Sequence, residues 1–352
     1  MAEGDYVSAR ESFDLALTIA RMEGNEALEM RTLDYAAQVD FWHFRLEDSL
    51  KSNLMAIDLA VSASDPRGEV SARYWASLCS FSLGNLPELK RQAAAIMEPA
   101  ERLRDRYWLA TAFSTVAFPL MRQGDWDSAK EANQRGLDLM PLDPRILFSQ
   151  IIAETQAGNQ SDAEAYLERL EDVVLQSAAG PNTADAFLAI ASPLTRSVFG
   201  AVKRPDLGES SLTTVLSSPA ATPYFLISAR LGASLLAVIN DDTEAAGEQY
   251  AALESWAGVA AVGANVDRVL GLLAGTKGNM DQAMAHFEDA LAFNGKAGYR
   301  PDLAWACFDY ADILVRRDGP DDRAKAIILL DESLAISTEL GMRPLMERAI
   351  AL

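Results

Sequence analysis

Apolar positions along this chain recur at helical spacing, in segments that come in pairs. The clearest pair spans residues 107–141, where two apolar-periodic segments meet at the turn Gly124-Asp125. Gly124 supplies the permissive backbone that ends the first segment, and Asp125 is suited to cap the free amides that open the second. The pattern therefore predicts a helical hairpin that ends at Pro141.

The same pair of segments recurs along nearly the whole chain. The turn positions Gly4, Phe44, Gly84 and Gly124 follow one another at a constant interval of 40 residues, and Gly158 comes 34 residues later. No stretch alternates with period two for long enough to predict a sheet. We therefore expect an all-α array of about eight to nine stacked hairpins, over residues 1–352, in which each hairpin buries its apolar face against its neighbours.

The match to the repeat differs along the chain. It is better over residues 4–176 and 223–340 than over residues 177–222, which are rich in serine, proline and glycine. In that irregular segment we expect one weak hairpin, with Pro193 in its first helix and a second helix near 207–216. Residues 342–352 predict a short helix that covers the last apolar face.

The repeat resembles the tetratricopeptide motif, which has a small residue in its first helix, a Gly-Asp or Gly-Asn turn, an alanine five residues later and a closing proline. The matching positions are Ala117, Gly124, Asp125, Ala129, Gly136 and Pro141. Asn133 departs from the motif, because a large apolar residue is usual there. The resemblance implies a right-handed α-α superhelix with first helices on the concave side and second helices facing outward.

The long period and the closing segment 330–352 resemble the C-terminal repeat arrays of large bacterial STAND-type regulators, such as the maltose-regulon activator, and of multidomain adenylate cyclases. Such arrays receive an inducer or a protein and signal to an upstream ATPase, cyclase or DNA-binding module. Residues 4–16 match the second helix of a repeat whose first helix is missing. We therefore expect a piece of a longer chain with such a module upstream.

Composition narrows the classes of partner. With 51 acidic and 31 basic residues the formal net charge is −20, which disfavours binding to nucleic-acid phosphate. The two cysteines, Cys79 and Cys307, provide no disulfide framework and suggest buried thiols in a reducing compartment. There is no signal-peptide pattern and no apolar run that could span a bilayer, so we expect a cytoplasmic protein.

The sequence does not predict an enzyme. It contains no phosphate-binding glycine loop, no HExxH and no GxSxG. The histidines His43 and His286 lie in separate repeats without metal-ligand spacing, and we expect no cofactor. Acidic pairs such as Asp241-Asp242 lie at turns, where they are expected to cap the following helix.

The resemblance to tetratricopeptide proteins implies a binding groove lined by first-helix residues at fixed offsets before each turn. Carried over to this chain, the candidate groove residues are Arg31, Asp34, Gln38, Phe41, Tyr74, Leu78, Phe81, Thr111, Ser114, Phe118, Met121, Arg122 and Phe148. The same offsets also give Trp42, Ser71, Ser82, Arg145, Ile152, Thr155 and Gln156. The set lacks the lysine and arginine clamp of chaperone adaptors and is instead aromatic.

Two interpretations of the aromatic positions remain open. An aromatic lining suits a groove for an amphipathic helix or an extended apolar peptide. The same side chains would also serve as ordinary core between repeats of a tightly wound superhelix. We expect a non-enzymatic scaffold that binds a protein or peptide; the alternative is an inducer-sensing region that binds a small molecule.

Overall fold

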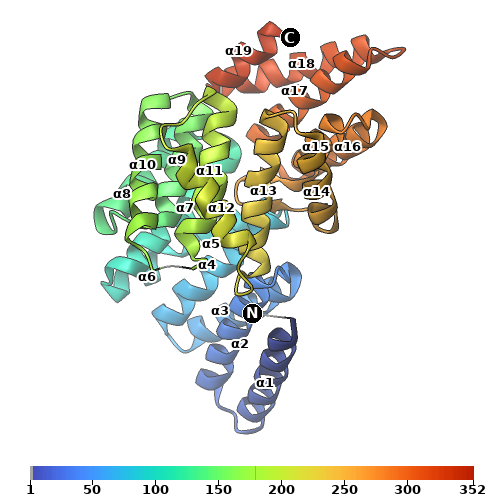
Figure 1. The fold of residues 1–352 in the computed structure, drawn as a ribbon. Helices are drawn as coiled ribbons and strands as arrows, with labels where there is room; N and C mark the ends of the chain where they lie inside the picture. Colours follow the sequence, from blue (N-terminus) through green and yellow to red (C-terminus); the bar gives the residue numbers. More distant parts are fainter. Residues whose placement is uncertain (1–2, 179) are drawn as a thin grey trace.

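The computed structural model describes residues 3–178 and 180–352, and its helices form a superhelical array of hairpins (Figure 1). The first helices of the hairpins are α2 (Glu26–Trp42), α4 (Pro66–Ser82), α7 (Arg106–Gln123), α9 (Pro144–Ala157), α11 (Thr183–Phe199), α13 (Pro223–Ile239), α15 (Val266–Thr276) and α17 (Arg300–Arg317). The second helices are α3 (Leu46–Ser62), α5 (Leu86–Ala95) with α6 (Met97–Leu103), α8 (Trp126–Leu139), α10 (Gln160–Gln176), α12 (Pro205–Leu216), α14 (Thr243–Leu253), α16 (Met280–Ala297) and α18 (Asp322–Glu339). The predicted all-α fold class is confirmed.

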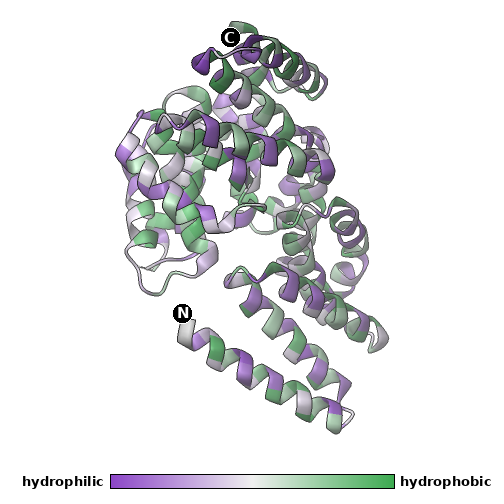
Figure 2. Ribbon diagram, turned by 90° about the vertical axis from the view of Figure 1, so that its right-hand side faces the viewer, coloured by the Kyte–Doolittle hydropathy of each residue, from purple (hydrophilic) through white to green (hydrophobic). Residues whose placement is uncertain are grey.

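The ends of the array are single helices. α1 (Glu3–Met22) packs on α2 at one end, and α19 (Arg343–Ala351) packs on α18 at the other. Figure 2 shows α1 at the edge of the molecule, with apolar and polar residues alternating along it. On its outer side Val7, Leu15 and Met22 are exposed, so this helix has one covered and one uncovered apolar face.

Each hairpin turn uses the same backbone device. One of the two residues after the first helix adopts the left-handed conformation, with φ of 79° at both Gly124 and Gly158. Phe44 takes this conformation without being glycine, at φ 61°, which accounts for the regular 40-residue interval at a turn that lacks the motif glycine. At three of these turns the following residue, Asn85, Asp125 or Asp242, then caps the second helix; Asp125, for example, accepts a hydrogen bond from the amide of Ser128.

The segment that looked irregular in sequence contains a hairpin, α11 and α12. α11 runs from Thr183 to Phe199 without interruption although Pro193 lies inside it. Close approach explains the firm packing there: a Cβ added to Gly232 of α13 would lie 2.0 Å from the carbonyl oxygen of Ala189 in α11. This contact needs glycine, because any side chain would clash with the backbone.

One element was not predicted. After α14 the chain forms a 3-10 turn (Glu254–Trp256) and a small antiparallel hairpin of β1 (Ala260–Ala261) and β2 (Ala264–Asn265). The two strands are only two residues long, which is too short for an alternating pattern to appear in the sequence. The tip of this hairpin, Val262-Gly263, lies in the interior of the array.

The array winds back on itself, so that its later hairpins cover its own earlier first helices. α13 meets α2, where the rings of Phe41 and Tyr224 lie 4.9 Å apart. α17 meets α7, and α19 meets α9, where Arg343 donates a hydrogen bond to the carbonyl oxygen of Ala157. One hydrophobic cluster consequently runs from Phe41 in α2 to Leu345 in α19.

The two cysteines and the apolar character of the helices were also subjects of prediction. Cys79 and Cys307 are both buried free thiols, as predicted. Within residues 3–178 and 180–352, no helix combines the length and the apolar character that crossing a membrane requires.

Candidate functional site

Eight of the thirteen candidate groove residues surround one internal cavity of about 80 Å³, called here the inner cavity. They come from α2, α4, α7 and α9, so successive first helices do line the inside of the array. These residues are Phe41, Tyr74, Leu78, Phe81, Phe118, Met121, Arg122 and Phe148. Arg145 and Ile152, which share the same offsets, line it as well.

The other five candidates lie elsewhere. Arg31 is exposed to solvent. Asp34 is buried and accepts hydrogen bonds from Ser71 and from Gln38, which ties α2 to α4. Thr111 is buried and accepts a hydrogen bond from Arg145, and Ser114 is buried with a hydroxyl that has no partner within the described chain.

The offsets fail at these positions for a geometric reason. The lining position moves along successive helices, from Phe41 at the end of α2 to Phe148 near the start of α9. Because the superhelix twists, the cavity crosses the first helices obliquely rather than at one fixed height. The offset furthest from the turn therefore gives a lining residue in α9, Arg145, but not in α2 or α7, where it gives Arg31 and Thr111.

A second, larger pocket of about 730 Å³ adjoins the inner cavity and is called here the outer pocket. Its walls are aromatic and apolar, and they include Trp42, Trp75 and Tyr107 together with the loop between α8 and α9. The two pockets share six residues, which we call the neck. The neck residues are Phe41, Tyr74, Leu78, Arg145, Phe187 and Tyr224.

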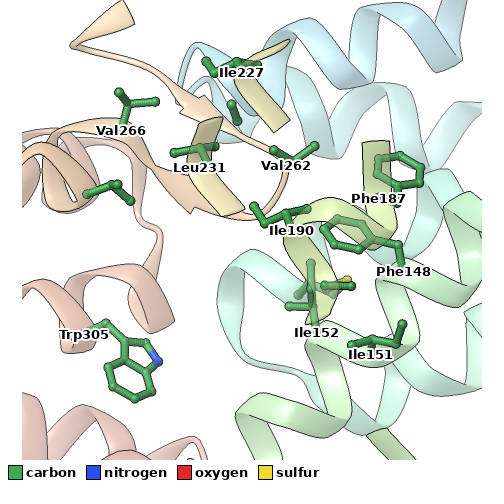
Figure 3. Close-up of a cluster of buried hydrophobic side chains, with 14 of the residues drawn as sticks. Phe148, Ile151, Ile152, Phe187, Ile190, Ile227, Leu231, Val262, Val266 and Trp305 are labelled. Carbon is green, nitrogen blue, oxygen red and sulfur yellow. The ribbon is translucent and has the colours of Figure 1, made fainter. Parts of the chain in front are cut away.

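Sequence reasoning missed two of the neck residues. Phe187 stacks on Phe148 with ring centroids 4.7 Å apart and an interplanar angle of 2° (Figure 3). It lies 13 residues before Gly200, as Arg145 lies 13 residues before Gly158, so the same offset would have found it. Tyr224 has no such local signal, because only the return of α13 onto α2 brings it to the site.

The β-hairpin tip closes the inner cavity. Val262 lies beside Ile190 and Phe148 in Figure 3, and Val262 and Gly263 both line the cavity wall. Val262 has φ of 40°, an unfavourable backbone conformation for a β-branched residue. At Gly263 (φ 84°), an added Cβ would lie 2.7 Å from the Cδ1 atom of Ile152, so the tip fits tightly against α9.

The arginine at the neck is neutralised within the chain. Arg145 donates through Nη2 to Asp143 at 2.6 Å and through the same atom to the Thr111 hydroxyl at 3.2 Å. Its guanidinium also lies over the rings of Tyr74 and Tyr107, 5.4 and 5.0 Å from their centroids. These contacts hold Arg145 against the aromatic wall and compensate its charge.

The arginine of the inner cavity is also paired. Arg122 is 5% exposed and donates through Nη1 to Asp302 of α17 at 2.9 Å. The guanidinium lies 5.0 Å from the centroid of Phe81, and Tyr299 stacks on the same phenylalanine. Each buried cation of the site therefore has its own carboxylate.

Two tyrosine hydroxyls remain as the polar groups of the neck. Burial raises the pKa of Tyr74, an effect that nearby Arg145 partly offsets, and burial raises the pKa of Tyr224 strongly. Both phenols are therefore protonated at neutral pH. The hydroxyl of Tyr224 has no hydrogen-bond partner among the described residues, although the residue is 8% exposed.

One group of residues has the donor types of a metal site. Ligand atoms of Asp267, His286 and Asp289 all lie within 4.8 Å of one another. However, Nε2 of His286 is 2.7 Å from the hydroxyl of Tyr250, and Nδ1 is 3.3 Å from Asp267. Both ring nitrogens are thus engaged, and the group is accounted for as a hydrogen-bonded network between α14, α15 and α16.

Comparisons with known proteins identify no family. No protein-family model matches this sequence, and a search of curated proteins finds no relative. Arguments about function therefore rest on the geometry of the two pockets.

Proposed function

We propose that this chain is a tetratricopeptide-like superhelix that binds a small molecule in the inner cavity and outer pocket. The observation that carries the proposal is the joined pair of aromatic pockets at the centre of the array. Small-molecule sites have volumes of about 300–1,000 Å³ and apolar linings with few polar groups. The outer pocket, at about 730 Å³, falls in that range.

The winding of the array favours a small molecule over a long peptide. Tyr224 covers Phe41, and Tyr299 stacks on Phe81, so later hairpins occupy surface that an open superhelix would present to a partner. What remains between them is a pocket rather than a continuous groove. This favours the small-molecule alternative for the same candidate residues.

The resemblance to STAND-type and cyclase arrays supplies a biological setting for this binding. A small molecule held between early and late hairpins would stabilise their mutual contact, and that state would be read by an ATPase or cyclase module. We accordingly propose a non-enzymatic sensor region of a bacterial regulatory protein in the cytoplasm.

A second candidate function is the binding of an apolar peptide segment. It is favoured by the outer pocket itself, which is open to solvent and framed by Trp42, Trp75, Pro141 and Pro144. Aromatic and proline side chains of this kind suit an extended or helical peptide whose apolar residues insert into the pocket.

The test uses Nile red, a neutral apolar dye, with the full chain. Thr183 lines the outer pocket at the start of α11, and Thr183→Trp should fill that pocket and weaken dye binding about tenfold. Ser210→Trp makes the same change at an exposed position of α12 and serves as the control. If the dye does not bind, or both variants bind it equally well, the proposal is wrong.

The same two variants examine the peptide alternative. A neutral amphipathic helical peptide, labelled with a fluorophore, is titrated into the wild type and into Thr183→Trp. Tight peptide binding that Thr183→Trp abolishes, with no dye binding, would favour the second candidate. Thermal unfolding of each variant confirms that the tryptophan substitutions leave the fold intact.

A further inference from the structure

We propose that the ligand of this site is a neutral amphiphile: an apolar body in the outer pocket, with one carbonyl or hydroxyl group at the neck. This inference rests on the proposed function and specifies the chemical class of the ligand. It follows from the charges of the site, the hydroxyl of Tyr224 and the sizes of the two pockets.

The buried charges of the site are already paired within the chain. Arg145 is paired with Asp143 at 2.6 Å, and Arg122 with Asp302 at 2.9 Å, so the buried walls carry no uncompensated charge. An ionised ligand group placed there would lose its hydration without gaining a free counter-charge. Phosphorylated compounds and other strongly charged molecules are therefore disfavoured.

The neck contains a hydroxyl that can bind a polar group of the ligand. The hydroxyl of Tyr224 has no partner among the described residues, although more than nine-tenths of the residue is buried and it lines both pockets. This oxygen is not among the fully buried unpartnered atoms of the described residues, so it reaches the pocket space, where a ligand acceptor at the neck can take its hydrogen bond. Tyr74, also at the neck, offers a second hydroxyl to the same group.

The inner cavity is much smaller than the outer pocket. The inner cavity holds about 80 Å³ and is lined mainly by phenylalanine, methionine and aliphatic side chains. It admits only a small apolar end group, whereas the outer pocket accommodates the body of the molecule against Trp42, Trp75 and Phe187. The acceptor group then lies between these two apolar parts.

One cation of the outer pocket is not buried. Arg106 lies on the exposed rim and donates to the carbonyl oxygen of Leu139. An anion that reaches this position remains in water, where such pairs contribute little. The rim nevertheless offers an alternative position for a carboxylate, and the experiment must separate it from the neck.

The experiment compares three probes of nearly equal shape by calorimetric titration of the full chain. They are 2-acetylnaphthalene, which carries a carbonyl group, 2-ethylnaphthalene, which has no acceptor, and 2-naphthoate, which is an anion. We expect the ketone to bind about fivefold to tenfold more tightly than the hydrocarbon, and the carboxylate to bind weakest. In Tyr224→Phe the advantage of the ketone over the hydrocarbon should disappear while the hydrocarbon still binds.

The outcomes separate this inference from the proposed function. If none of the three probes binds, the proposed small-molecule site itself is wrong. If all three bind equally, or the carboxylate binds best, the pocket stands but its ligand is not a neutral amphiphile. Carboxylate binding that Arg106→Gln removes and Tyr224→Phe leaves unchanged would place the ligand's polar group at the rim and overturn the inference.

Discussion

Arg122 of α7 and Asp302 of α17 join an early and a late hairpin of the wound array. They lie 180 residues apart in the sequence, yet Nη1 of Arg122 is 2.9 Å from Oδ2 of Asp302, and their side chains are only 6% and 13% exposed. Arg122 also forms part of the inner cavity wall. The contact between early and late hairpins therefore shares a side chain with the candidate binding site.

Removing one partner of this ion pair should be strongly destabilising. In Asp302→Ala the charge of Arg122 stays buried without its carboxylate, which typically costs about 3–5 kcal/mol in the free energy of unfolding. Arg300→Ala is the control, because it removes an ion pair with Glu339 on the exposed surface of the same helix and should cost less than about 1 kcal/mol. Urea unfolding followed by circular dichroism measures both; similar losses would contradict the prediction.

Close packing of α11 on α13 should make Gly232 intolerant of any side chain. The Cβ of Gly232→Ala would meet the Ala189 carbonyl oxygen at 2.0 Å, and the forced shift should cost about 3 kcal/mol. Gly247 lies inside α14, where an added Cβ has no neighbour closer than the Cε atom of Lys277 at 3.8 Å. Gly247→Ala should therefore stabilise the chain by about 0.5–1 kcal/mol through helix propensity. Equal melting temperatures for the two variants would refute this packing argument.

Both thiols should be unreactive until the chain unfolds. Burial raises the pKa of Cys79 to about 12, and burial together with the nearby charge of Glu332 raises that of Cys307 to about 12. At pH 8 almost no thiolate is present, and neither sulfur is accessible. A chromogenic disulfide reagent should label neither cysteine in the native protein and both in 6 M guanidinium chloride. Rapid native labelling at either position would show that its helices open readily.

Because of Asp34, the free energy of unfolding should decrease as the pH rises. Burial raises the pKa of its carboxyl group, an effect that hydrogen bonds from Ser71 and Gln38 only partly offset. The unfolded carboxyl, with a pKa of about 3.9, loses its proton first, so stability decreases with rising pH until the folded group has also ionised.

The variant Asp34→Asn isolates this contribution. It should make the decrease above about pH 4 smaller, while the part that comes from other carboxyl groups with a raised pKa, such as those of Asp40 and Asp309, remains. Asp58→Asn, at an exposed position of α3, is the control and should retain the wild-type slope. Unfolding free energies measured between pH 4 and 7 decide the matter; parallel profiles for wild type and Asp34→Asn would contradict the assignment.

Local sequence signals predicted most of the helices. The turn at Gly124-Asp125 combines a left-handed glycine with a capping aspartate, and both act within a few residues of chain. The left-handed glycine recurs at Gly158 and Gly278. The β-hairpin at Val262-Gly263 escaped prediction because its strands contain too few residues to form a pattern.

The candidate site was predicted only in part. Phe81, Phe118 and Met121 line the inner cavity as their position on the first helices implied, because that position depends mainly on the repeat. Arg31 and Ser114 do not, because the twist of the array shifts the lining position from one helix to the next. The two interpretations of the aromatic positions also converge, since Phe41 and Phe148 are buried core residues and cavity walls at once.

By itself, the sequence determined the all-α class, the helical hairpins and which helices face inward, since helix periodicity and turn chemistry act over a few residues. The tertiary structure decided how the array closes. Tyr224 meets Phe41, and Asp302 meets Arg122, because small rotations between neighbouring repeats add up along the array. A local sequence pattern does not specify that total rotation. That closure converts an expected open groove into two joined pockets.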